Sequence, residues 1–197
     1  KNVLNNPFCP LVTEPAFDHS RNKILFFSGG QKWVDNSLFL QNIYECLKNM
    51  PEIEAIFVSD LKDHENPEAK FISKLVQLPN IIRYESLSYF AYKSLLSKVA
   101  GTLDWSSINI ERKYSTSTRI IQSVGCGSAV FTLEDTGLDF FWNNFPGERS
   151  INPPSAEQIK SFICSAINHN YKNDLLDAYN WNLKVITNKK YFANICR

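Results

Sequence analysis

Five short apolar runs, separated by segments of helical periodicity, constrain what this chain can fold into. The runs show little polar alternation, and two of them end directly in Ser-Gly or Ser-Asp, as in strands that are buried on both faces of a sheet. Between the runs, apolar residues recur every three or four positions, as on one face of an α-helix. The predicted strands span residues 23–27, 53–58, 81–84, 101–105 and 129–132.

This alternation predicts βαβ units and therefore a doubly wound α/β fold, a Rossmann-like parallel sheet with helices on both faces. The predicted helices span about residues 38–47, 71–76, 89–99, 118–125, 155–169 and 172–187. Residues 1–20 hold three prolines and are predicted to be a linker or arm. Residues 21–154 are predicted to form the Rossmann-like domain, and residues 155–197 a C-terminal helical tail that packs on it.

Composition narrows the classes of partner. The 21 Lys and Arg side chains balance 20 Asp and Glu side chains, so no charge excess favours nucleic acid or an anionic membrane. No apolar run approaches the roughly 18 residues typical of a transmembrane helix. The five cysteines include no CxxC pair and the three histidines no metal-binding spacing. This pattern is typical of reduced thiols in a cytoplasmic protein and argues against a metal site.

In a doubly wound sheet, ligands bind beyond the carboxyl ends of the strands, so the loops there are the candidate sites. Gly29, Gly30 and Lys32 follow the first strand. Two glycines allow the backbone to approach a phosphate closely, and Lys32 can add a positive charge. The spacing matches neither a GxGxxG nor a P-loop motif, so a plain tight turn fits this loop equally well.

The most informative loop joins the fourth strand to a helix. Four hydroxyl residues precede or begin that helix: Ser115, Thr116, Ser117 and Thr118. One of them suffices as an N-cap, so the remaining hydroxyls, the helix amides and the helix dipole predict an anion site. Arg119 stands in the first turn, where a cation is unfavourable unless an anion lies beside it. The alternative is a polar loop with one cap, in which Arg119 pairs with a nearby acid.

The segment after this loop resembles the donor-site helix of GT-B glycosyltransferases. Residues 119–132 read RIIQSVGCGSAVFT. This segment is similar to the family pattern R-(apolar)-x-E-(small)-(apolar)-A-x-G-x-x-(apolar)-(apolar), in which a helix is joined to a strand. Gly127 is expected at the helix C′ position with a positive φ. Residues 109–112 and 115–119 also match the frame of a group 1-like family related to spore-coat glycosyltransferases, N-(apolar)-x-R followed by S-x-x-T-R.

The sequence departs from that family at two acidic positions. Many retaining members carry two glutamates in an E-x7-E arrangement, where this chain has Tyr114 and Gln122. Gln122 can still hydrogen-bond a ribose hydroxyl, although it accepts less strongly than a carboxylate. Glu111 is acidic but stands out of register with the family pattern.

The resemblance implies an enzyme that transfers a sugar from a nucleoside diphosphate sugar to a glycan, lipid or protein acceptor, as in polysaccharide biosynthesis. It implies a set of donor-binding residues that divide into phosphate, base and sugar contacts. The phosphates would meet Gly29, Gly30 and Lys32 from one side and Ser115, Thr116, Ser117, Thr118 and Arg119 from the other, the base would lie near Tyr84 and Glu85, and the sugar or ribose near Glu111 or Gln122.

The resemblance also implies that no metal or other cofactor is needed, because amides and basic groups stabilise the leaving diphosphate. The acceptor site and catalytic base would belong to an N-terminal domain that these residues lack, so this chain is expected to bind the donor and catalyse little. We expect a cytoplasmic protein, with any contact to the membrane surface made by the absent domain.

Three alternatives remain. A catalytically silent α/β scaffold is one, since the E-x7-E pair is missing. A receiver-like module is disfavoured, because its acidic cluster is missing after the first strand. A sugar-nucleotide epimerase of the GT-B fold is disfavoured because such enzymes use cleft histidines.

Overall fold

The structure, a computed structural model, describes residues 21–27, 35–59, 68–106, 117–134 and 145–187. Its strands form one parallel sheet in the order β3-β2-β1-β4-β5-β6. They are β1 (Lys23–Phe27), β2 (Glu54–Val58), β3 (Ile81–Tyr84), β4 (Val99–Asp104), β5 (Ala129–Leu133) and β6 (Gly147–Ser150). The order reverses between β1 and β4, which confirms the predicted doubly wound α/β fold.

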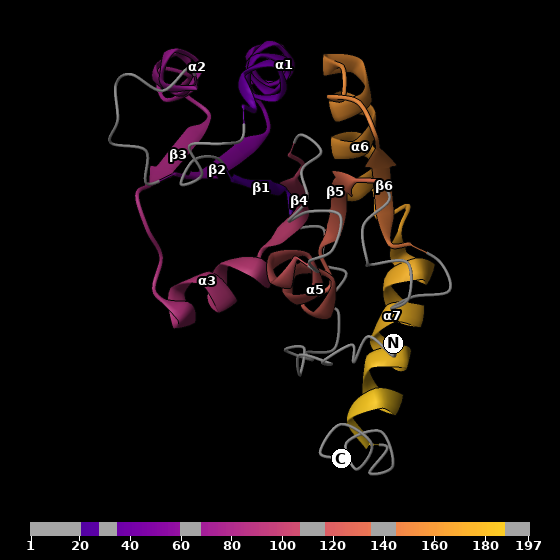
Figure 1. The fold of residues 1–197 in the computed structure, drawn as a ribbon. Helices are drawn as coiled ribbons and strands as arrows, with labels where there is room; N and C mark the ends of the chain where they lie inside the picture. The colour runs from indigo at the N-terminus through magenta and orange to yellow at the C-terminus, as the bar shows by residue number, and fades with distance from the viewer. Residues whose placement is uncertain (1–20, 28–34, 60–67, 107–116, 135–144, 188–197) are drawn as a thin grey trace, which may run out of the picture.

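Helices cover both faces of this sheet (Figure 1). They are α1 (Ser37–Lys48), α2 (Ala69–Leu75), α3 (Tyr89–Leu96), α5 (Thr118–Gly125), α6 (Ala156–Ile167) and α7 (Lys172–Thr187). Alternate side chains of a strand point to opposite faces. Accordingly, Ile24 and Phe26 pack into the core beneath α1, α2 and α6, whereas Leu25 packs on the opposite face near α3. The sheet is therefore buried on both sides, as the apolar runs predicted.

Several boundaries differ from prediction by one or two residues, and the difference is largest where α3 leads into β4. Helix α3 ends at Leu96 rather than near residue 99, and β4 begins at Val99 rather than at residue 101. Val99 and Ala100 are buried residues of β4, so the apolar spacing that they continue belongs to the strand rather than to the helix. Strand β6 was not predicted, because its sequence GERS lacks an apolar run. A Cβ at Gly147, the first β6 residue, would collide with the Val130 carbonyl oxygen.

The turn that ends α5 is held by a glycine and by a buried arginine. Gly127 has a φ of 78°, as predicted for the residue after a helix C-cap. Arg21 donates from its guanidinium to the carbonyl oxygens of Cys126 (3.3 Å) and Gly127 (2.9 Å). A cation at a helix C-terminus opposes the negative end of the helix dipole. The segment that enters β1 is thus fastened to the end of α5.

The two C-terminal helices pack on different faces of the sheet. Helix α6 begins with a capping box, in which Ser155 and Gln158 bond each other's backbone N–H groups. Phe162 of α6 packs edge-on against Phe131 of β5, with ring centroids 5.5 Å apart. Helix α7 packs on α5, where Leu175 joins a buried apolar cluster. Helix α5 is therefore enclosed between the sheet and α7.

One side chain joins the ends of three elements. The Asn80 amide nitrogen donates to the carbonyl oxygens of Leu47 (3.2 Å), Met50 (3.0 Å) and Ile53 (3.0 Å). These oxygens belong to the last turn of α1 and to the segment that leads into β2. Asn80 itself immediately precedes β3.

Replacing Asn80 with Ala is expected to lower the free energy of unfolding by about 1–3 kcal/mol, because part-buried carbonyl oxygens lose their donor. Urea unfolding followed by circular dichroism measures this change. The matched control is Asn49→Ala, whose amide makes one exposed bond to the Glu45 carbonyl oxygen and whose loss should cost within about 0.5 kcal/mol. Equal losses in both variants would contradict this role for Asn80.

Candidate functional site

A pocket lies where the strand order reverses. Because the chain leaves β1 and β4 in opposite directions, their carboxyl ends open a crevice between them. A pocket of about 220 Å³ occupies this region and is formed by the ends of β1 and β2 and the first turns of α3 and α5. Its lining residues are Phe27, Val58, Leu87, Tyr89, Tyr92 and Arg119.

The buried carboxylate of Asp104 organises the α5 side of this crevice. Asp104 is the last residue of β4 and is only 3% exposed. The Ser117 hydroxyl donates to Asp104 Oδ2 at 2.7 Å, and Arg119 Nη1 lies 3.6 Å from Asp104 Oδ1. Asp104 is therefore the nearby acid that the sequence analysis gave as a possible partner of Arg119. Its contacts join the start of α5 to the end of β4.

The contact with Asp104 leaves part of the Arg119 side chain accessible, since that side chain is 40% exposed. Its separation of 3.6 Å from Asp104 is longer than a hydrogen bond, and a guanidinium carries five N–H donors. Arg119 makes no side-chain hydrogen bond with any residue that the structure describes. Its guanidinium carbon lies 4.7 Å from the Phe27 ring centroid, a cation–π contact that holds the group at the pocket. Its donors can therefore bind a ligand.

The N-terminus of α5 adds further donors. Ser117 is the N-cap residue, yet its hydroxyl is directed to Asp104, and none of the described side chains caps the helix. The Ile121 amide already bonds the Ser117 carbonyl oxygen. The amides before it, at Thr118, Arg119 and Ile120, are the orphan donors of a helix start, at the positive end of the helix dipole. An uncapped helix beside a guanidinium can bind an anion.

The opposite wall of the pocket is aromatic. Ser88 caps α3 by accepting a hydrogen bond from the Ala91 amide at 3.3 Å, which fixes where the first turn of the helix begins. That turn brings Tyr89 and Tyr92 to the pocket, and Tyr92 packs edge-on against Phe27 with centroids 6.0 Å apart. Burial raises the pKa of the Tyr92 phenol above its ordinary value.

The residues predicted for the site fall into three groups. Arg119 lines the pocket, and Ser117 and Thr118 stand beside it at the start of α5. Tyr84 and Glu85 lie exposed at the end of β3, at the same edge of the sheet, but outside the pocket lining. Gln122 is half-buried one turn further along α5 and also lies outside the lining. The predictions for Gly29, Gly30, Lys32, Glu111, Ser115 and Thr116 lie outside the described residues.

Asp104 and the apolar walls were missed by the sequence prediction. The signal for Asp104 was an acid inside the predicted buried strand, where a charge requires a partner. Phe27 and Val58 were predicted only as the ends of buried strands. Their side chains carry no signal that separates a pocket wall from the core.

No known family profile matches this sequence, and no curated protein is similar to it in sequence. Solved structures are similar in fold. Anabaena HepE in complex with UDP-glucose matches with a TM-score of 0.63 at 13% identity, over 89% of this chain and 49% of that one. S. aureus TarM, in complex with UDP and sugars, matches with a TM-score of 0.63 at 10% identity, over 94% and 37%. The UDP-GlcNAc 2-epimerase of Neisseria meningitidis matches with a TM-score of 0.56 at 14% identity, over 90% and 45%.

At these identities the likeness concerns the fold. The chain has the fold of a GT-B glycosyltransferase domain, which confirms the fold that the resemblance implied. It spans half or less of the length of each of these three structures. None of the described helices has both the length and the apolar composition needed to cross a lipid bilayer.

The two partners of the ion pair are expected to contribute differently to stability. Asp104→Ala should lower the free energy of unfolding by about 2–3 kcal/mol, because a buried charge-assisted hydrogen bond is lost. Arg119→Ala should lower it by less than about 1 kcal/mol, because the arginine is partly exposed. Urea unfolding of both variants measures the difference. If Arg119→Ala costs as much as Asp104→Ala, Arg119 is a structural residue rather than one held for a ligand.

Proposed function

We propose that this chain is the donor-binding, C-terminal domain of a GT-B glycosyltransferase, and that it binds a nucleoside diphosphate sugar. Transfer to the acceptor would require an N-terminal domain that supplies the acceptor site and the catalytic base. One observation carries this proposal: an uncapped helix N-terminus and a partly exposed guanidinium lie together at the crevice where the strand order reverses.

The diphosphate is the part of the donor that this geometry suits best. Amides at the start of α5 and the donors of Arg119 would bind its oxygens, and Asp104 would keep Arg119 in place. Negative charge accumulates on the diphosphate as the glycosidic bond to it breaks, so the same donors would stabilise the leaving group. The loop that carries Gly29, Gly30 and Lys32 would approach from the end of β1. We propose that no metal is needed.

The nucleoside and sugar would lie on either side of the diphosphate. Leu87, Tyr89 and Phe27 offer apolar and aromatic surface for a flat base, with Tyr84 and Glu85 next to them at the end of β3. Gln122 and Glu111 would contact the ribose or sugar. A glutamine accepts a hydrogen bond less strongly than the carboxylate found in many relatives.

Nucleotide binding is expected to raise the melting temperature. A ligand at ten times its Kd adds about 1.4 kcal/mol of stability, which corresponds to roughly 3–6 °C for a chain of this size. Differential scanning fluorimetry with UDP, GDP and CMP and with their sugars measures this shift. We expect one diphosphate to produce it, with or without EDTA, and Arg119→Ala to abolish it.

Lys160→Ala is the matched control for this experiment, because Lys160 is an exposed cation on α6, on the opposite face of the sheet. It should keep the shift in full. Absence of any shift at millimolar nucleotide would favour the silent scaffold instead. The epimerase alternative gains no support from the pocket, whose described lining contains neither a histidine nor a carboxylate.

A further inference from the structure

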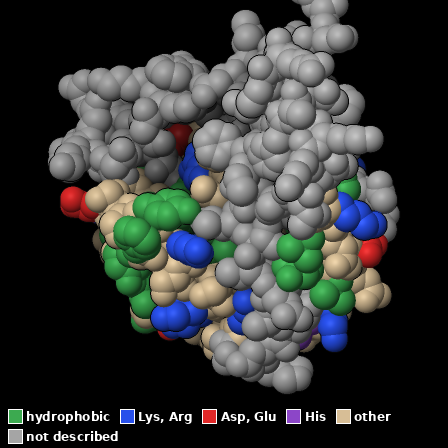
Figure 2. Space-filling model, turned by 90° about the horizontal axis from the view of Figure 1, so that it is seen from below, with side chains coloured by type: hydrophobic (Ala, Val, Ile, Leu, Met, Phe, Trp, Pro, Cys, Tyr) green, Lys and Arg blue, Asp and Glu red, His purple; other side chains and the backbone are tan. Residues whose placement is uncertain are grey.

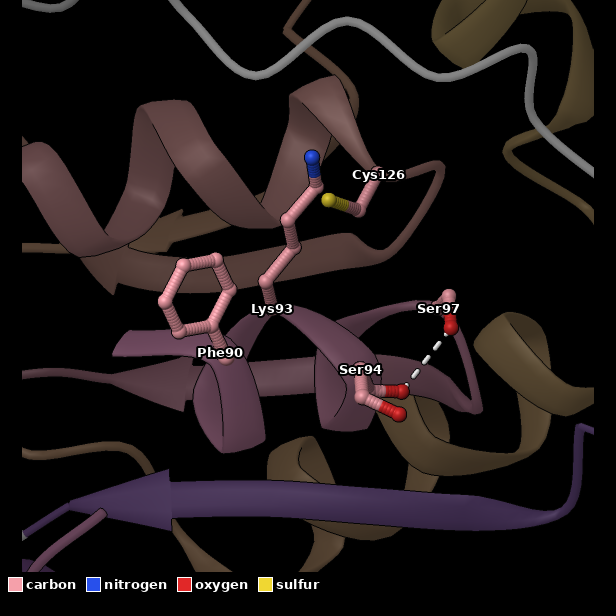
Figure 3. A pocket seen from close by; sticks show the side chains of 5 residues that line it. All are labelled: Phe90, Lys93, Ser94, Ser97 and Cys126. Carbon is pink, nitrogen blue, oxygen red and sulfur yellow. Dashed lines mark hydrogen bonds between the residues drawn. The ribbon is translucent and has the colours of Figure 1, made fainter. Parts of the chain in front are cut away.

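A second pocket lies on the face of the sheet that α3, α5 and α7 cover. Its volume is about 260 Å³, and its lining residues are Phe90, Lys93, Ser94, Ser97 and Cys126 (Figure 3). The first four belong to α3 and its C-cap, and Cys126 is the C-cap residue of α5. On the same face of the molecule, hydrophobic side chains lie beside Lys and Arg side chains (Figure 2).

Helix α3 separates this second pocket from the crevice. Tyr89 and Tyr92, three positions apart, line the crevice pocket, whereas Phe90, Lys93 and Ser97 line the second one. These two sets follow helical spacing on two faces of the same short helix. Helix α5 also reaches both pockets, with Arg119 at its start and Cys126 at its end. Each helix therefore contacts both pockets.

The lining of the second pocket combines an exposed aromatic ring with a cation. Phe90 is 81% exposed, the largest exposed fraction among the large hydrophobic residues that the structure describes. Lys93 forms no ion pair with any carboxylate among the described residues. Ser97 donates its hydroxyl to the Ser94 carbonyl oxygen at 2.8 Å, so this group is already used. What the pocket offers a ligand is the Phe90 ring and the Lys93 charge.

These features define a chemical class of ligand. A flat apolar body can stack on the Phe90 ring, and a carboxylate, sulfonate or phosphate can pair with the Lys93 ammonium. The pocket has room for a ligand on the order of ten non-hydrogen atoms, given the roughly 30 Å³ that one water molecule occupies. A small amphipathic anion satisfies both the charge and the size.

We propose that this pocket, the α3–α5 pocket, binds a small amphipathic anion and that its occupancy changes the affinity of the crevice for nucleotide. The binding part stands on the pocket alone, whereas the coupling part rests on the proposed function. Coupling follows because a ligand that shifts α3 moves Tyr89 and Tyr92 on its other face. Thermodynamic linkage requires that nucleotide then change the affinity of the α3–α5 pocket by the same factor.

The fluorescent dye 1-anilinonaphthalene-8-sulfonate is a suitable probe, since it joins an aromatic body to one sulfonate. The dye is about twice the size that the pocket holds, so we expect the sulfonate and one part of the aromatic body to enter while the rest stays in solvent. Titration of the folded chain is expected to give saturable fluorescence. Lys93→Gln should weaken dye binding about five- to tenfold through loss of the charge pair, and Phe90→Ser should weaken it as well. Lys98→Gln is the matched control, because Lys98 is exposed just after α3 and does not line the pocket.

Three results would overturn the binding part. Equal affinity in Lys93→Gln and the unchanged chain would show that Lys93 does not bind the anion. Equal weakening in Lys98→Gln would show only a general effect of charge. Weakening in Arg119→Ala but not in Lys93→Gln would place the dye in the crevice. Melting curves of each variant establish that it is folded before the titration.

The coupling part is tested by repeating the titration with a saturating amount of the nucleotide that produces the melting shift. A change in dye affinity that is lost in Phe90→Ser is expected. If that nucleotide leaves the dye affinity unchanged, coupling is refuted. If no nucleotide of the series binds, the proposed function fails as well, whereas the dependence of dye binding on Lys93 still decides whether the α3–α5 pocket is a site.

Discussion

The burial of one carboxylate at the end of β4 determines the geometry of the crevice. A charge that is removed from water requires partners, and Asp104 obtains them from Ser117 and Arg119. The same contacts have a second effect. They take the Ser117 hydroxyl away from the helix that it would otherwise cap, and they hold Arg119 over the Phe27 ring. A single anchor thus leaves donors available at the position where the strand order reverses.

Burial on both faces made most of the fold predictable from the sequence. The apolar runs located five strands, and Gly127 at the C′ position located the end of α5. Strand β6 could not be located in this way, because an edge strand with the sequence GERS buries little and is recognisable only by its pairing with β5. The end of α3 was placed too late because Val99 continues the apolar spacing of a helix and equally suits a strand.

The sequence indicated the edge of the sheet where the candidate pocket lies, but not its lining. The rule that ligands bind beyond strand ends drew attention to Tyr84 and Glu85, which lie at the same edge of the sheet as the pocket, but it does not tell which side chains face the pocket. The side chains of Leu87, Tyr89 and Tyr92 line the pocket. Their positions depend on where α3 begins, which the Ser88 cap determines. The partner of Arg119 was foreseen as a possibility, yet only the fold shows that Asp104, fifteen positions earlier, is that acid.

This fold occurs in a transferase and in an epimerase, so the chemistry of this chain has to be argued from its side chains. A crevice with amides, a guanidinium and aromatic walls suits a nucleoside diphosphate, whatever reaction follows. The residues that distinguish one reaction from another would come from the partner domain and from the sugar end of the site. Gln122 stands where the family pattern that this chain resembles has an acid, and under the proposed function it would lie at the sugar end.

Arg21 has a consequence for how α5 is held in place. Its two bonds to the carbonyl oxygens of Cys126 and Gly127 fasten the start of the described chain to the C-terminal end of α5. At the other end of the same helix, Ser117 and Arg119 contact the buried Asp104. Both ends of this eight-residue helix are therefore anchored, so α5 cannot tilt at either end without breaking contacts to a neighbouring segment.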